Sequence, residues 1–176
     1  MSQQHQLLSY DPQGTHEPLK LLQIFLSEQT TTHHPSTANH PDPAISLDEI
    51  FRLGDFLFGP TFESAVTILD ASESLISRIV SAPSQRMAYL VTSSGKQPYT
   101  KYLCLLPRNN ISSNGICYCS CRSFMEKNSR SKYLQPCKHL LALLLLPHVN
   151  VTCATLETLT DEEFGRLLVT CGSPTT

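Results

Sequence analysis

The feature that most constrains this chain is a set of metal-ligand residues arranged in two tight pairs. Cys119 and Cys121 flank one serine, and fifteen residues later Cys137 and His139 flank one lysine. A structural zinc site takes four such ligands in a tetrahedron and leaves no position open for water. Residues two apart on an extended segment point the same way, so a strand end can present the first pair together. The spacing therefore predicts one structural zinc ion.

The choice of the first pair is left open by spacing alone. Cys117 lies on the same strand face as Cys119 and Cys121, so Cys117 with Cys119 is an alternative pair. Cys121 is favoured because it lies nearer the loop that must return to Cys137. The remaining cysteines are scattered and are predicted to be small buried hydrophobic residues; they are Cys104, Cys153 and Cys171.

The cellular compartment decides whether clustered cysteines indicate metal or disulfides. The first residues, MSQQHQ, lack the basic and apolar regions of a secretory signal. The longest apolar run, Leu140–Leu146, is far shorter than the roughly 20 residues of a membrane span. We therefore expect a soluble intracellular chain without membrane contact, in which thiols stay reduced and bind metal.

Charge is segregated along the chain. The total of 13 Lys+Arg against 15 Asp+Glu gives a net charge of −2, which excludes a broadly basic nucleic-acid binder. Ten of the basic residues nevertheless lie between Arg78 and Lys138, where Glu126 is the one acid. The segment after Cys121 is predicted to be a polar basic loop with Phe124 and Tyr133 interleaved, which could follow phosphates and stack on a base. Its possible DNA contacts are Arg122, Lys127, Arg130 and Lys132. The alternative is that these cations balance an anionic zinc cluster.

Hydrophobic patterning predicts an α+β fold with N-terminal helices, a small three-stranded antiparallel sheet, the zinc finger and C-terminal helices. Helices are expected at 18–28, from the capping box of Ser46 and Glu49 to about Leu57, and from Thr61 to about Asp70. Strands are expected at 74–80, 86–92 and 99–106, and further helices at 137–146 and 155–170.

These elements divide the chain into three parts. Residues 1–45 are predicted to be an N-terminal extension, with a short helix and a disordered linker rich in Thr, His and Pro. Residues 46–150 form the helical and β-sheet core, with the zinc finger at about 116–147, and 151–176 a C-terminal helix and tail. Leucines surround the helix at 137–146, so both its sides must be buried, either by another helix of the chain or by a partner protein.

Residues 119–124 (CSCRSF) and 136–142 (PCKHLLA) resemble the C-x-C-x-x-F start and the C-K-H end of the SWIM zinc finger. That resemblance selects Cys119 and Cys121 as the first pair. Together with LFG at 57–59 and the total size, the pattern is similar to the SWIM-domain subunits of Shu complexes, which assist homologous recombination.

The resemblance implies a nuclear, non-enzymatic protein without a small-molecule substrate. It implies a heterodimer with a RecA-like recombinase paralogue, and a pair that promotes recombinase filament assembly on single-stranded DNA in double-strand break repair. It also favours such a partner as the cover for the leucine-rich helix.

Three other functions could use the same residues. A SWIM finger could serve as a general protein- or DNA-interaction module outside recombination. A cysteine-dependent enzyme, with Cys137 as nucleophile and His139 as base, is disfavoured because residues two apart on a helix point about 200° from one another. A zinc hydrolase is disfavoured because four protein ligands leave no position for water.

Overall fold

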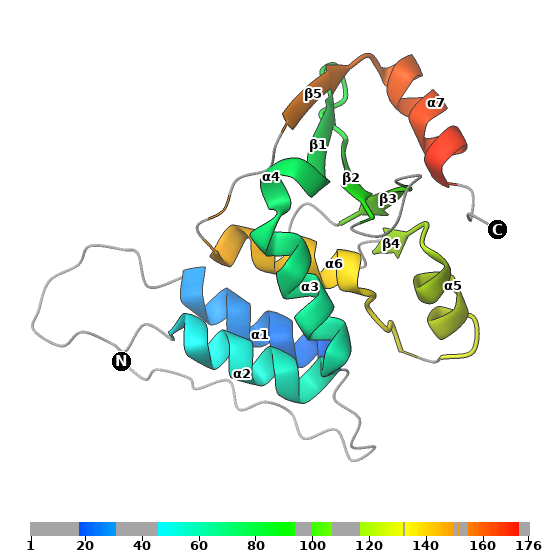
Figure 1. Cartoon of the computed structure of the whole chain (residues 1–176). Helices are drawn as coiled ribbons and strands as arrows, with labels where there is room; N and C mark the ends of the chain where they lie inside the picture. The colour runs from blue at the N-terminus through cyan, green and yellow to red at the C-terminus, as the bar shows by residue number, and fades with distance from the viewer. Residues whose placement is uncertain are drawn as a thin grey trace, which may run out of the picture.

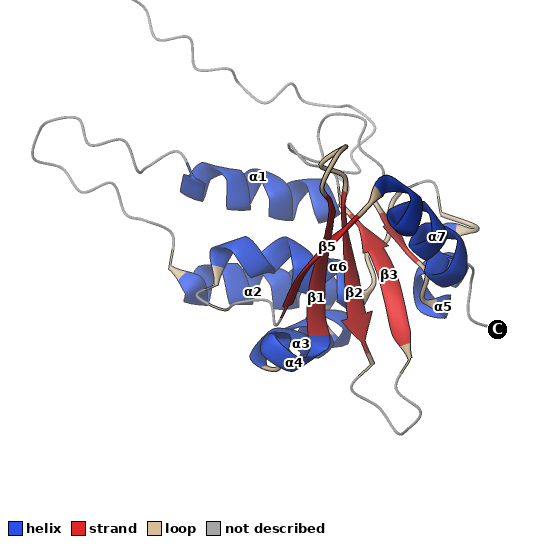
Figure 2. Ribbon diagram, turned by 90° about the horizontal axis from the view of Figure 1, so that it is seen from above, coloured by secondary structure: helices blue, strands red, loops and turns tan. Residues whose placement is uncertain are grey.

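A five-stranded sheet with helices on both faces organises the chain (Figures 1 and 2). The structure is a computed structural model that describes residues 18–30, 46–93, 100–106, 117–131, 133–149, 151 and 155–172. The strand order is β4-β3-β2-β1-β5. The strands are β1 (Ile76–Ser81), β2 (Met87–Thr92), β3 (Lys101–Leu105), β4 (Tyr118–Cys119) and β5 (Thr155–Leu159). Neighbours from β1 to β4 are antiparallel, whereas β5 runs parallel to β1.

The helices divide between the two faces of the sheet. They are α1 (Pro18–Thr30), α2 (Leu47–Phe58), α3 (Pro60–Asp70), α4 (Ser72–Leu75), α5 (Arg122–Asn128), α6 (Lys138–Leu145), the 3-10 helix η2 (Leu146–His148) and α7 (Asp161–Gly172). Figure 2 shows α7 on one side of the sheet and α1 to α4 on the other. The sheet is therefore buried from both directions.

Side chains of alternate strand residues supply a separate core to each face. On the side of the sheet that faces α1 to α4, the core includes Ile76, Val91 and Cys104. On the side that faces α7, Leu90 and Leu103 pack against Phe164 and its neighbours. Because successive strand residues point to opposite faces, strands covered on both sides are apolar at neighbouring positions. This explains the continuous apolar runs in the central strands.

The α2–α3 corner follows from local capping. The backbone N–H of Glu49 donates to Ser46 Oγ, and the Glu49 carboxylate accepts from the backbone N–H of Ser46 at 2.7 Å. This reciprocal pair is the predicted capping box. Gly59 ends α2 with φ of 49°, a left-handed conformation that glycine adopts readily, and Pro60 then begins α3.

The α+β class is confirmed, but the predicted number of strands was wrong. The sheet has five strands rather than three. β5 occupies the start of the helix predicted at 155–170, and α7 begins only at Asp161, after Thr160 and Glu163 form a capping box of their own. β4 has two residues, too few to produce a periodic pattern.

Two further expectations need correction. The segment after Cys121 is not wholly a loop, because α5 forms there and buries Phe124. The leucine-rich α6 is covered by the chain itself, with α3 packed along it and Leu140, Leu141, Leu143 and Leu145 buried. A partner protein is therefore not needed to cover α6.

Some predictions concern residues outside the described ranges. They concern Cys153, Lys132 and, except for α1, the extension at 1–45. Among the described helices, none combines the length and the apolar character needed to cross a membrane.

The close approach of α2 and α3 generates a stability prediction. A Cβ added at Gly54 would lie 2.0 Å from a ring carbon of Phe62, which is itself buried and packed edge-on against Phe51. We expect Gly54→Ala to lower the free energy of unfolding by about 1–3 kcal/mol, because the buried ring must move. The matched control is Gly165→Ala on α7, where a Cβ meets nothing within 4 Å, and which should raise stability by about 0.5–1 kcal/mol. Urea unfolding of both variants measures the contrast, and equal effects would contradict the assigned contact.

The junction of α7 with β1 generates a pH prediction. The Asp161 carboxylate accepts hydrogen bonds from the hydroxyls of Ser81 and Ser84, which hold the pKa of Asp161 below its usual value. A carboxyl whose pKa is lower in the folded state stabilises the fold above its unfolded pKa and loses that contribution as the pH falls through the folded pKa. Asp161→Asn should therefore lower the urea midpoint near pH 7, and the difference from the native chain should shrink toward about pH 3. A difference that stays constant with pH would contradict this contact.

Candidate metal centre

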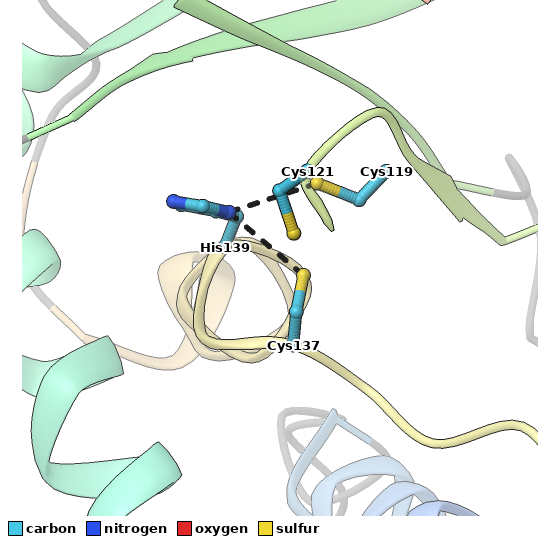
Figure 3. A group of neighbouring side chains, drawn as sticks. All are labelled: Cys119, Cys121, Cys137 and His139. Carbon is cyan, nitrogen blue, oxygen red and sulfur yellow. Dashed lines mark hydrogen bonds between the residues drawn. The ribbon is translucent and has the colours of Figure 1, made fainter. Parts of the chain in front are cut away.

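Four buried side chains from three elements converge at one point (Figure 3). Cys119 ends β4, Cys121 is the N-cap of α5, Cys137 is the N-cap of α6, and His139 lies in the first turn of α6. One ligand atom from each residue lies within 4.8 Å of the others. The structure thus brings together the four residues that the two tight pairs predicted.

The first pair is positioned by the edge of the sheet. Cys119 is the register partner of Cys104 across β3 and β4. The buried Ser120 bonds to β3 twice: its backbone N–H donates to the carbonyl of Leu103 at 2.9 Å, and its Oγ accepts from the Leu103 N–H at 3.0 Å. These bonds fix the residue between the two cysteines, so that both neighbours are turned to the metal side.

The return of the chain to the second pair depends on Asn128. Its side-chain amide donates to the carbonyls of Phe124 at 2.8 Å and Gln135 at 2.9 Å, and its Oδ1 accepts from the Gln135 N–H at 2.7 Å. Asn128 therefore links the end of α5 to the segment just before Cys137. This positioning residue was missed from the sequence, because an asparagine in a polar segment gives no sign of which carbonyls it binds.

The second pair faces one point because its two residues differ in backbone conformation. Cys137 is an extended N-cap with φ −87° and ψ 170°, whereas His139 is helical. The separation of about 200° expected for two helical residues therefore does not apply. The Nδ1 atom of His139 lies 3.6 Å from Cys119 Sγ and 3.9 Å from Cys137 Sγ.

The imidazole is held by stacking. Its ring lies on that of Tyr102, with centroids 4.6 Å apart and an angle of 29° between the planes. Nε2 is buried and has no hydrogen-bond partner among the described residues. Figure 3 shows this nitrogen at the end of the ring away from the sulfurs. A metal at Nδ1 would fit this orientation, since the proton of a neutral ring would then reside on Nε2.

The thiols titrate as one interacting group. Hydrogen bonds from Cys119 and Cys137 lower the pKa of Cys121, while the pKa values of Cys119 and Cys137 are raised by their hydrogen bonds to neighbouring sulfurs and by burial. Burial and the close approach of the sulfurs therefore oppose the presence of three thiolates at this point without a cation. A dication reverses this balance by stabilising every thiolate at once. Three sulfurs and one imidazole nitrogen form a donor set that suits tetrahedral zinc.

Two cysteines outside the group clarify the earlier alternatives. Cys117 is partly exposed and is not a member of the cluster, so the structure assembles the set that contains Cys121. Cys104 is fully buried, as predicted, but its Sγ also lies 3.5 Å from Cys119 Sγ. That contact arises from strand register, which spacing along the chain does not reveal.

Three of the four predicted DNA-contact residues lie on α5 or just after it. Arg122 and Lys127 are on α5 and Arg130 follows it, and all three are exposed. Arg122 pairs with Glu126 at 2.6 Å, and Lys127 Nζ donates to Thr61 Oγ1 at 3.4 Å. Lys132, the fourth predicted contact, is outside the described residues.

Comparison with known proteins identifies the family. The human Zinc finger SWIM domain-containing protein 7 is 33% identical to the chain over 122 residues, which are 69% of this chain and 76% of the human protein. The chain belongs to the SWIM-type zinc finger proteins. The mouse Zinc finger SWIM domain-containing protein 7 is 34% identical over 104 residues, and this SWIM protein spans 59% of the mouse sequence. No family model and no solved structure matches the chain.

The geometry of this SWIM cluster predicts which cysteines retain metal. We expect Cys121→Ser or Cys137→Ser to remove most of the bound zinc and to lower the thermal midpoint, because each leaves three ligands and a weakened link between β4 and α6. Cys117→Ser is the matched control and should keep the zinc content of the native chain. Elemental analysis of zinc per protein chain, with thermal unfolding, measures both effects. Zinc loss from Cys117→Ser together with retention by Cys121→Ser would reverse the assignment.

Proposed function

We propose that the chain is a non-enzymatic zinc-binding subunit of a Shu-type complex in the nucleus. It pairs with a RecA-like recombinase paralogue and promotes assembly of the recombinase filament on single-stranded DNA during homologous recombination. The observation that carries this proposal is the buried group of three cysteines and one histidine, joined to the SWIM sequence pattern. The relatives support the SWIM finger, and the resemblance to Shu-complex subunits supports the role in recombination.

Zinc in this proposal is a structural ion. Cys119, Cys121, Cys137 and His139 would hold one ion, which supplies a cross-link between the sheet edge and the starts of α5 and α6. The binding free energy of such an ion is folding free energy, because the unfolded chain has no preformed site. Four protein ligands around zinc also leave no position for an attacking water, which supports a non-enzymatic role.

The surface offers an exposed aromatic side chain for contact with the proposed partner. Phe56 on α2 is 86% exposed, which is unusual for so large an apolar side chain. Leu47 on the same helix, together with Leu21 and Ile24 of α1, is also exposed. Helices α1 and α2 lie side by side away from the sheet (Figure 1). Leu47 and Phe56 are nine residues apart and therefore lie on opposite sides of α2. Large exposed aromatic side chains are typical anchors of protein interfaces, so we assign the side of α2 that carries Phe56 to the recombinase paralogue.

Co-expression tests the partner. The native chain should co-purify with a RecA-like recombinase paralogue of the same organism as a one-to-one complex. Phe56→Asp should reduce the recovered complex by about tenfold or more, because a charge replaces an apolar anchor in a buried contact. Val169→Asp is the matched control, since Val169 is 76% exposed on α7, and it should leave the complex intact.

Two outcomes would contradict the proposal. A native chain that remains a stable monomer beside the paralogue would remove the heterodimer and would favour a SWIM interaction module outside recombination. Equal loss of complex in the Phe56 and Val169 variants would remove the assigned face. Zinc content of each variant shows in parallel whether the metal centre is intact.

A further inference from the structure

A cavity of about 410 Å³ lies against the metal cluster, and three of the four ligands, Cys121, Cys137 and His139, form part of its wall. Its wall is built by the start of α3, by Tyr102 of β3, by α5 and by the start of α6. Residues that carry the argument are Thr61, Arg122, Lys127, Lys138 and His139. Apart from these three ligands, the wall has no part in the proposed zinc role or in the contact assigned to Phe56.

The wall is strongly cationic. It contains Arg122, Lys127 and Lys138 and no carboxylate. Arg122 shares its charge with Glu126, but neither lysine forms an ion pair with any described residue. Three thiolates around a zinc ion would carry one net negative charge, so the two lysines exceed the charge that the metal cluster requires. The excess of one positive charge matches one monoanionic group.

Hydrogen-bond donors lie in the same wall. Thr61 Oγ1 accepts from Lys127 Nζ at 3.4 Å, which leaves the hydroxyl proton of Thr61 available to a ligand oxygen. His139 also lines the cavity, and its Nε2 is buried without a partner among the described residues. A metal-bound imidazole ordinarily gives this N–H to an acceptor. A ligand that brings anionic oxygens would therefore meet both positive charge and the hydroxyl of Thr61.

We propose that this cavity binds one phosphodiester phosphate of a single-stranded nucleic acid. Lys127 and Lys138 neutralise the phosphate, Arg122 borders it, and Thr61 donates to one of its oxygens. A phosphodiester carries a single negative charge, which balances the one excess positive charge of the wall. The basic segment continues beyond the cavity through the exposed Arg130 and the 41%-exposed Tyr133, which offers a ring on which a base can stack. An acidic peptide would make no use of that ring.

The inference rests on the zinc centre of the proposed function, because the ligands Cys121 and Cys137 begin the helices that carry Arg122 and Lys138. It adds to the DNA contacts predicted from sequence, since Lys138 and Thr61 come from other elements and complete a defined phosphate site.

Binding of a fluorescent oligothymidylate to the zinc-loaded full chain tests the proposal. The double variant Lys127→Gln/Lys138→Gln should bind about tenfold more weakly at low salt and reduce the slope of log K against log salt by about 1, the signature of lost phosphate contacts. The matched control is Arg52→Gln/Arg166→Gln, which removes the same charge from exposed positions on α2 and α7 and should keep the native affinity and slope.

Each result has a distinct meaning. The zinc content of every variant is measured in parallel, so that loss of the metal centre is distinguished from loss of the phosphate site. A native chain that contains no zinc would contradict the proposed function. Equal affinity and slope in the two double variants would overturn the phosphate site even with zinc present. Absence of oligothymidylate binding by the native chain, or displacement of the oligonucleotide by polyglutamate as effectively as by unlabelled oligothymidylate, would also overturn it. Displacement by inorganic phosphate only at far higher concentration than by oligothymidylate would support the strand as the source of the phosphate.

Discussion

Mutual proximity of three thiols and an imidazole is the constraint on which this structure depends. The sulfurs of Cys119, Cys121 and Cys137 are so close that each affects the ionisation of the others, and three thiolates at this distance repel one another. A dication bound to all three thiolates would replace this mutual repulsion with attraction to the metal. Because the ligands come from the sheet edge and from the starts of two helices, that attraction would join β4, α5 and α6 at one point.

The ligand set could be predicted from sequence because its geometry is local. Alternation along a strand turns Cys119 and Cys121 the same way, and an extended N-cap followed by a helical turn lets Cys137 and His139 converge. Helix α2 could be predicted for a similar reason, since the Ser46–Glu49 capping box lies within four residues. The central strands could be predicted from short apolar runs bounded by turn-forming residues. In each case, the information and the structure it determines lie within one short segment.

Features that depend on distant contacts could not be predicted. β4 is two residues long, and it exists because Ser120 and its neighbours pair with β3. β5 exposes 64% of Leu156 and gains its order from pairing with β1, which no local pattern encodes. The leucines around α6 showed that the helix is buried but not by what, and packing against α3 supplies the answer. Asn128 and Cys104 likewise acquire their roles only from the segments that the fold places opposite them.

The basic block and the metal centre are parts of one arrangement. Cys121 precedes Arg122, and Cys137 precedes Lys138, so each N-cap ligand orients a helix whose first residue is a cation in the wall of the same cavity. A thiolate-rich cluster draws cations toward itself, and rigid helix starts keep them from collapsing onto the sulfurs. Charge that would be dispersed in an unfolded chain is thereby concentrated on one side of α5 and α6. Under the proposals made above, the ion that stabilises the fold also maintains the anion site, and the two properties would be lost together on removal of the metal.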